Sequence, residues 1–225
     1  MSQTQPDALL AGATGRTGEA LLNALLASGR YGRVHQLTNR EQVSSHRGLE
    51  YWQLPEPLSA ETLQHANAPA VRDVYIMSFA DRLHSQRDKA VHTVPAELAE
   101  ALAAAAAKAG AERLFIVCPL TATEQMSSFQ HFYAGAETTL NLARLPYRRV
   151  AILLPTEAAT APPAQGFWPK LRHAYLSQFR LMLPQSTAPF TPGRFCEAVL
   201  RVAEQGGSGM QVYGATALHA LLKTK

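Results

Sequence analysis

Short apolar runs alternate with amphipathic segments along most of the chain. The runs at 73–80 and 113–120 are apolar at almost every position, which is typical of central strands buried on both faces. The segments at 17–28, 94–109 and 131–143 have the length and spacing of helices. This alternation predicts βαβ units, and therefore an α/β fold with a doubly wound, mostly parallel sheet and helices on both faces. The expected strands are 8–12, 33–39, 49–54, 73–80, 113–120 and 148–155.

The pattern changes after Pro155. The letters TEAATAPPAQGFWP are rich in Pro, Ala and Thr and predict a loop, and we expect an irregular substrate or lid region at 155–193. A helix-like segment at 170–183 lies within it, and its aromatic and basic residues favour packing on the core over docking to a partner or membrane. A helix at 196–205, a strand at 209–214 and a final helix follow. No clean boundary divides the chain, so we predict a single domain over 1–225.

Composition narrows the classes of protein. The 225 residues are 47% hydrophobic and 17% charged, which is ordinary for a globular domain. The net charge of +4 comes from scattered residues, so neither a nucleic-acid partner nor a membrane partner is expected. The two cysteines lack CxxC spacing, and His84 and His92 stand eight residues apart, so no metal site is predicted. A reducing cytoplasm fits this cysteine content, and neither a secretory leader nor a membrane span is expected.

The letters LLAGATGRTGEALL place three glycines between a strand and a helix. Gly12 would permit a tight turn, Gly15 a close approach of the backbone to a pyrophosphate, and Gly18 close packing of helix on strand. The first N–H groups of the helix would then face the phosphates. This context favours a dinucleotide site over a simple turn. The predicted contacts in the loop are Gly12, Thr14, Gly15, Arg16, Thr17 and Gly18.

The end of the second strand indicates which dinucleotide is bound. An acid there would accept a hydrogen bond from a ribose 2′-hydroxyl, whereas a cation would bind a 2′-phosphate. The strand ends in LTNR, with no acid before Glu41, so Asn39 and Arg40 favour NADP over NAD, with Arg16 alongside. The alternative for Arg40 is an exposed loop charge. Ser78, Phe79 and Pro155 are also predicted to contact the coenzyme.

Four segments together resemble a known family. They are LLAGATGRTGEALL, AAKAGAERLFIVCPLTA, SSFQHFYAGAETTL and AVLRVAEQGGSGMQVYGATALHALLK. The chain resembles the atypical short-chain dehydrogenase/reductase group of NmrA-like and Tat-interacting-protein-like proteins over nearly its whole length. The resemblance implies a Rossmann fold and NAD(P)-dependent oxidoreductase activity.

In that family a serine after the fifth strand and a Tyr-x-x-x-Lys helix carry the proton chemistry. The matching positions here are Cys118 for the serine, His131 for the tyrosine and Gly135 for the lysine. The arginine that usually precedes Pro155 is replaced by Leu154. The usual catalytic pair is therefore degenerate.

Two other groups are candidates for the missing chemistry. Tyr133 is followed four residues later by Glu137 instead of Lys, so its phenol lacks the cation that would lower its pKa. Cys118 and His131 would form a thiol-imidazole pair if they converge. The alternative is a buried cysteine at a strand end and a helical histidine facing a polar cleft.

Two functions remain open at this point. In the first, the chain is a divergent oxidoreductase that acts on an unidentified small molecule, with His131, Cys118, Tyr133 or solvent as the proton source. Alternatively it is a non-catalytic nucleotide sensor or scaffold whose occupancy is read by a protein partner. A third case, a nucleotide site that no longer binds, and an oligomeric assembly also stay open.

Overall fold

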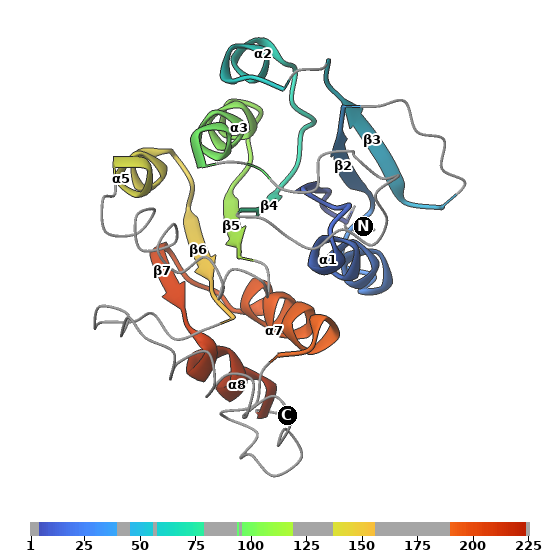
Figure 1. Ribbon diagram of the computed structural model, residues 1–225, viewed down its shortest axis with the longest axis vertical. Helices are drawn as coiled ribbons and strands as arrows, with labels where there is room; N and C mark the ends of the chain where they lie inside the picture. Colours follow the sequence, from blue (N-terminus) through green and yellow to red (C-terminus); the bar gives the residue numbers. More distant parts are fainter. Residues whose placement is uncertain are drawn as a thin grey trace, which may run out of the picture.

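The computed structural model describes residues 5–39, 46–55, 58–78, 94, 96–118, 137–155 and 190–223. In this part of the chain, seven parallel strands form one sheet in the order β3-β2-β1-β4-β5-β6-β7 (Figure 1). The strands are β1 (Ala8–Ala11), β2 (Val34–Thr38), β3 (Leu49–Gln53), β4 (Asp73–Met77), β5 (Arg113–Val117), β6 (Arg149–Leu153) and β7 (Gly209–Tyr213). The helices are α1 (Arg16–Ala27), α2 (Ala60–His65), α3 (Ala96–Lys108), α5 (Glu137–Arg144), α7 (Pro192–Glu204) and α8 (Ala215–Lys223).

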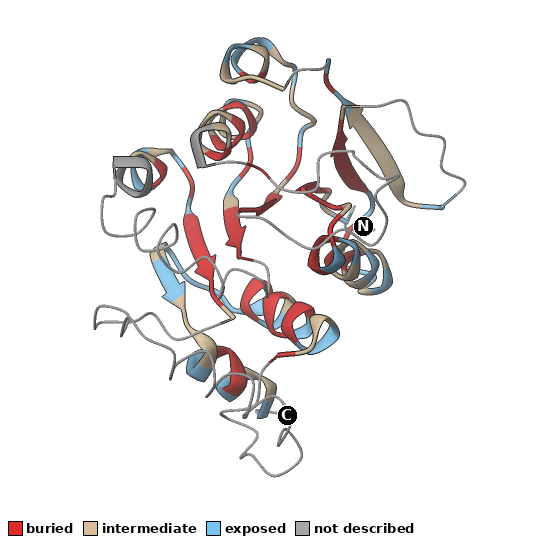
Figure 2. Ribbon diagram, in the orientation of Figure 1, coloured by how far each residue is buried: buried red, intermediate tan, exposed pale blue. Residues whose placement is uncertain are grey.

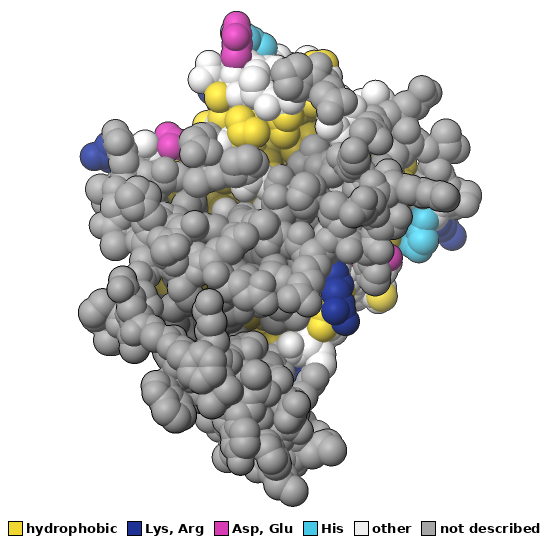
Figure 3. All heavy atoms as spheres, in the orientation of Figure 1, with side chains coloured by type: hydrophobic (Ala, Val, Ile, Leu, Met, Phe, Trp, Pro, Cys, Tyr) yellow, Lys and Arg dark blue, Asp and Glu magenta, His cyan; other side chains and the backbone are white. Residues whose placement is uncertain are grey.

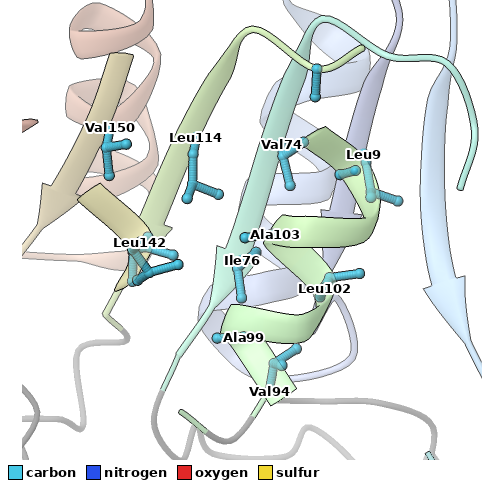
Figure 4. Close-up of a cluster of buried hydrophobic side chains, with 14 of the residues drawn as sticks. Leu9, Val74, Ile76, Val94, Ala99, Leu102, Ala103, Leu114, Leu142 and Val150 are labelled. Carbon is cyan, nitrogen blue, oxygen red and sulfur yellow. The ribbon is translucent and has the colours of Figure 1, made fainter. Parts of the chain in front are cut away.

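Helices cover both faces of the sheet because its central strands are apolar on both sides. Successive residues of a strand point to opposite faces, so Leu9 joins one buried cluster and Leu10 the other. The first cluster contains buried residues of α2, α3 and α5, and Figure 4 shows α3 packing Ala99, Leu102 and Ala103 over Val74 and Ile76 of β4. The second cluster contains buried residues of α1, α7 and α8. The buried strands thus lie between two helical layers (Figure 2).

The predicted doubly wound sheet is confirmed, and all its described strand pairs are parallel. The order reverses at β1, whose neighbours are β2 and β4. The carboxyl ends of these strands meet at one edge, called the carboxyl edge below, and the opposite edge is the amino edge. A strand order that reverses beside the first strand places a crevice at the carboxyl edge, where such sheets bind ligands.

Two helices differ from the sequence expectation. Helix α7 begins at Pro192, four residues before the predicted 196, because the Thr191 hydroxyl accepts from the Arg194 N–H and proline fits a first helical turn. It therefore begins inside the expected irregular region 155–193, of which only Pro155 and residues 190–193 are described. Helix α2 was not expected. Ser59 caps it by accepting from the Thr62 N–H, and its six residues are too few to show a clear period.

The remaining helices agree where they are described. Helices α1 and α3 match the expected segments 17–28 and 94–109. The part of 131–143 that is described, Glu137 onward, is the helix α5, whereas the predicted helix at 170–183 lies outside the described residues. Among the described helices, none has the length and apolar character that a membrane crossing requires.

Candidate functional site

The glycine turn between β1 and α1 lies at the carboxyl edge. Gly12 follows Ala11, the last residue of β1, and has a φ of 89°, a conformation that side chains disfavour. Gly15 is the N-cap of α1 with φ −78° and ψ 166°, an extended conformation that other residues also adopt. The tight turn predicted at Gly12 is therefore confirmed, whereas the backbone conformation at Gly15 does not itself require glycine.

Gly18 brings the helix directly against the strand. A Cβ at this position would lie 2.1 Å from the carbonyl oxygen of Gly12 and 3.1 Å from the backbone of Ala13. No side chain fits at that distance from backbone atoms. The close packing of α1 on the end of β1, predicted for Gly18, is confirmed, and it places the first turn of α1 at the carboxyl edge.

Among the residues that the structure describes, no side chain caps the amino end of α1. Gly15 provides no capping side chain, whereas Ser59 caps α2 and Thr191 caps α7. The peptide dipoles give such an end a partial positive charge, which favours an anion. Arg16, the first residue of α1, is exposed and adds a full positive charge at the same end. Thr17 is buried, and its carbonyl oxygen accepts a hydrogen bond from Cys196 Sγ at 3.8 Å.

Two buried oxygen atoms flank the glycine turn. Asn39 follows β2 and Ser78 follows β4, and these strands are the two neighbours of β1. Within the described part of the chain, Asn39 Oδ1 and Ser78 Oγ are buried without a hydrogen-bond partner. Ser78 is only 1% exposed, and its N–H donates to the carbonyl of Val117 at 3.1 Å. Buried polar atoms without a partner are costly, which is an argument for a ligand that supplies one.

These residues fit a dinucleotide. The tight turn at Gly12 and the close packing at Gly18 place the end of α1 where it suits a diphosphate, and the two oxygens on either side suit the hydroxyl and amide groups of a ligand. Thr14 also belongs to this turn and is half-buried. Pro155, half-buried after β6, lies at the same edge. Arg40 and Phe79, the other predicted coenzyme contacts, lie outside the described residues.

Cys118 lies at the end of β5 and is fully buried. Its N–H donates to the carbonyl of Leu153 at 3.0 Å, and its side chain belongs to the apolar cluster that faces α3. Burial raises the pKa of the Cys118 thiol well above its ordinary value, which disfavours the thiolate. His131, Tyr133 and Gly135 lie outside the described residues, so the thiol-imidazole pair stays a prediction. The observed burial is that of the alternative, a structural cysteine at a strand end.

His84 and His92 lie outside the described residues, so the expectation of no metal site is not tested by the residues that the structure describes. No group of three or more potential metal ligands gathers among them. On the face shown in Figure 3, the Lys and Arg side chains of the described residues lie at separate places and form no continuous stripe.

A row of charged residues at the amino edge was missed from the sequence. Asp73, Arg113 and Arg149 are the first residues of β4, β5 and β6 and pair with one another in the strand register. Asp73 is fully buried and accepts hydrogen bonds from Arg113 and from the Tyr31 hydroxyl. The available signal was a charge directly before a buried apolar run in RDVYIM, ERLFIV and RRVAIL.

Known structures share this fold. Triphenylmethane reductase from Citrobacter sp., complexed with NADP(H), superposes with a TM-score of 0.55 at 17% identity, covering 93% of this chain and 69% of that chain. An oxidoreductase of the short-chain dehydrogenase/reductase family from Burkholderia thailandensis gives 0.54 at 16%, covering 96% and 94%. An oxidoreductase from Lactococcus lactis gives 0.53 at 15%, covering 96% and 97%. No family model and no curated protein matches the sequence.

The chain therefore has the Rossmann-type fold of these proteins. The expected resemblance to short-chain dehydrogenase/reductase proteins is confirmed at the level of the fold. The narrower NmrA-like grouping stays a prediction.

Proposed function

We propose that this protein binds a nicotinamide dinucleotide across the carboxyl edge of its sheet. The observation that carries the proposal is a pair of buried oxygens, Asn39 Oδ1 and Ser78 Oγ, on either side of the glycine turn, which have no hydrogen-bond partner among the described residues. Sequence and structure agree on that turn, and the Citrobacter reductase of the same fold is complexed with NADP(H). When bound, the coenzyme would supply a hydride donor or acceptor at its nicotinamide ring.

Different residues of this chain would bind different parts of the coenzyme. The amino end of α1, from Gly15 to Thr17, would hold the diphosphate. Asn39 and Arg40 would hold the ribose at the adenine end, and Ser78, Phe79 and Pro155 would complete the site. Thr38 and Asn39, the described residues that end β2 and follow it, carry no acid. This supports NADP over NAD, because an acid there would bind a 2′-hydroxyl and repel a 2′-phosphate.

Calorimetric titration with NADPH and NADH tests the proposal. We expect NADPH to bind more tightly than NADH. Equal affinities would remove the case for NADP, and no heat with either coenzyme would remove the site. Soluble aggregates are excluded by light scattering of the same samples.

Ser78→Ala adds a readout that separates ligand binding from structure. Removing an unpartnered buried hydroxyl should leave the free protein as stable as before or slightly more stable. Coenzyme affinity should fall by about threefold to tenfold, the effect of one hydrogen bond. Ser208→Ala, at an exposed position before β7, is the matched control and should change neither quantity.

Burial of Cys118 favours a non-catalytic nucleotide sensor over a reductase. The residue at the position of the family's serine is Cys118, a fully buried thiol whose pKa is raised by burial. It is therefore both a poor proton donor and a poor nucleophile. In this case coenzyme occupancy would act through a protein partner. Cys118→Ala and His131→Ala decide between the two. A reductase loses NADPH turnover while keeping its coenzyme affinity, whereas a sensor shows no turnover with or without these changes.

A further inference from the structure

Three arginines, one from the loop after α1 and one each from β5 and β6, hold the carboxyl end of α7. Arg30, Arg113 and Arg149 form this arginine clamp. Arg30 donates to the carbonyls of Leu200 and Ala203, each at 3.2 Å, and Arg113 donates to that of Ala203 at 2.9 Å. Arg149 donates through Nη1 to the carbonyls of Val202 at 2.9 Å and Gln205 at 2.5 Å. Carbonyls at the carboxyl end of a helix are short of hydrogen-bond donors within the helix and carry a partial negative charge. The clamp supplies both hydrogen-bond donors and positive charge at this end.

The clamp is itself fixed in place. Arg149 is 1% exposed and also donates to the Tyr213 hydroxyl at 2.7 Å. Arg113 is paired with the fully buried Asp73. Arg30 pairs with Glu204, in the last turn of α7, at 3.1 Å. Because its donors are buried or paired, the clamp holds the carboxyl end of α7 rigidly at the amino edge.

The amino end of α7 is held differently. Phe195 and Val199 pack in the apolar cluster shared with α1, and Cys196 Sγ donates to the Thr17 carbonyl at 3.8 Å. A thiol is a weak donor, so this contact is far weaker than the clamp. Thr17 belongs to the first turn of α1, the turn proposed to hold the diphosphate. The carboxyl end of α7 thus contacts the arginine clamp, whereas its amino end contacts the proposed diphosphate site.

We infer that α7 is fixed at its carboxyl end and coupled to coenzyme occupancy at its amino end. The inference rests on the proposed function. The opening that exposes Cys196 must separate α7 from Thr17 and so disturb the turn at Gly15–Thr17. A coenzyme that binds only the closed form suppresses that opening by a factor of one plus the ratio of ligand concentration to Kd. Because coupling is reciprocal, anything that separates α7 from α1 weakens coenzyme binding equally.

Thiol alkylation measures the opening at each cysteine. The chain has two cysteines, so Cys118→Ala reports on Cys196 alone and Cys196→Ala reports on Cys118 alone. Cys118 lies in the cluster on the opposite face of the sheet and is the internal comparison. Calorimetry first gives the Kd of NADPH for each variant. With NADPH at ten times its Kd, alkylation of Cys196 by N-ethylmaleimide should slow about elevenfold. In the free protein Cys196 should react faster than Cys118, and Cys118 should slow less wherever it reacts through a local opening that leaves Gly15–Thr17 in place.

Amide hydrogen exchange tests the fixed end. In the free protein, amides at Val202–Gln205 should exchange more slowly than those at Phe195–Val199 because the clamp protects them, and bound NADPH should slow exchange at Phe195–Val199 by the full factor. Equal protection along the whole of α7 overturns the fixed end.

The outcomes separate the inference from the proposed function. If NADPH binds but Cys196 reacts at an unchanged rate, the coupling is wrong and the coenzyme site stands. If Cys196 and Cys118 react at the same rate in the free protein and slow by the same factor, both are exposed by global unfolding and the local coupling is wrong. If calorimetry detects no NADPH binding, the proposed function and this inference both fail.

Discussion

Gly18 lies so close to Gly12 that a Cβ on the former would be 2.1 Å from the carbonyl oxygen of the latter. The Gly12 carbonyl directly follows β1 and the Cα of Gly18 belongs to α1, so both are backbone and neither can move aside as a flexible side chain would. The first turn of α1 and the end of β1 therefore hold their relative position only with glycine at residue 18. This contact defines the geometry of the proposed diphosphate site.

Gly18→Ala should push α1 away from β1. We expect it to destabilise the protein by about 1–3 kcal/mol, the usual cost of overpacking, and to weaken coenzyme binding at least tenfold. Chemical denaturation and calorimetry measure the two effects. Gly193→Ala is the matched control, because it lies in the first turn of α7 with nothing within 4 Å of its Cβ position. The control should be neutral or slightly stabilising, and a neutral Gly18→Ala would contradict the packing.

Asn39→Asp should reverse the preference between coenzymes. The side chain keeps its size, but the carboxylate repels a 2′-phosphate and accepts from a 2′-hydroxyl. We expect NADPH affinity to fall at least tenfold relative to NADH affinity, measured by titration of both coenzymes. Asn23→Asp places the same charge on the exposed face of α1 and is the control. A parallel change in both affinities would show that Asn39 does not lie at the 2′ position.

Asp73→Asn should be strongly destabilising. The buried carboxylate accepts from Arg113 and from the Tyr31 hydroxyl at 2.6 Å, and its loss leaves the largely buried Arg113 without its counter-charge. We expect a loss of about 3–5 kcal/mol in free energy of unfolding, the cost of breaking a buried pair from one side. Glu50→Gln breaks the exposed pair with Arg33 and should cost less than about 1 kcal/mol. Comparable losses in the two variants would refute the burial argument.

The same carboxylate predicts a dependence on pH. Burial acts to raise the pKa of Asp73, but hydrogen bonds from Arg113 and Tyr31 outweigh it and hold that pKa below its ordinary value. A lowered folded-state pKa contributes stability that is complete above the unfolded-state pKa of about 4 and is lost as pH falls through the folded-state pKa. Denaturation curves from pH 7 to pH 2 should therefore show this loss in the wild type. This contribution of Asp73 to the loss of stability at low pH should be missing from the Asp73→Asn variant.

Gln211→Glu should stabilise the protein. Arg149 is buried, and the contacts described for its guanidinium are carbonyls, the Tyr213 hydroxyl and Gln211 Oε1, without a carboxylate. A glutamate at 211 keeps the acceptor for Arg149 Nη2 and Tyr213 and adds the opposite charge. We expect a gain of about 1 kcal/mol at pH 7, lost as pH falls below about 4. Gln211→Met, which removes the acceptor, should destabilise instead. A gain with both variants would show that charge is irrelevant there.

Much of the architecture follows from local patterns. Residues 73–80 and 113–120 predict central strands because almost every position is apolar, and the glycine spacing from Gly12 to Gly18 predicts the turn because each glycine serves a local backbone need. The unexpected helix α2 is too short for its period to be read. The start of α7 at Pro192 depended on the capping hydroxyl of Thr191, a signal that the sequence contains but that the apolar pattern does not show.

The sequence by itself determined the order of the strands and of the longer described helices, the parallel sheet and the place of the glycine turn, because these follow from patterns along the chain. Only the tertiary structure decided which polar groups are satisfied. Arg30 contacts the Ala203 carbonyl across 173 residues, and Cys196 contacts Thr17 across 179. Within the part of the chain that is described, the buried oxygens of Ser78 and Asn39 have no partner beside a turn that follows another strand. Such pairings arise when the sheet brings distant strand ends to one edge, and no local period encodes them.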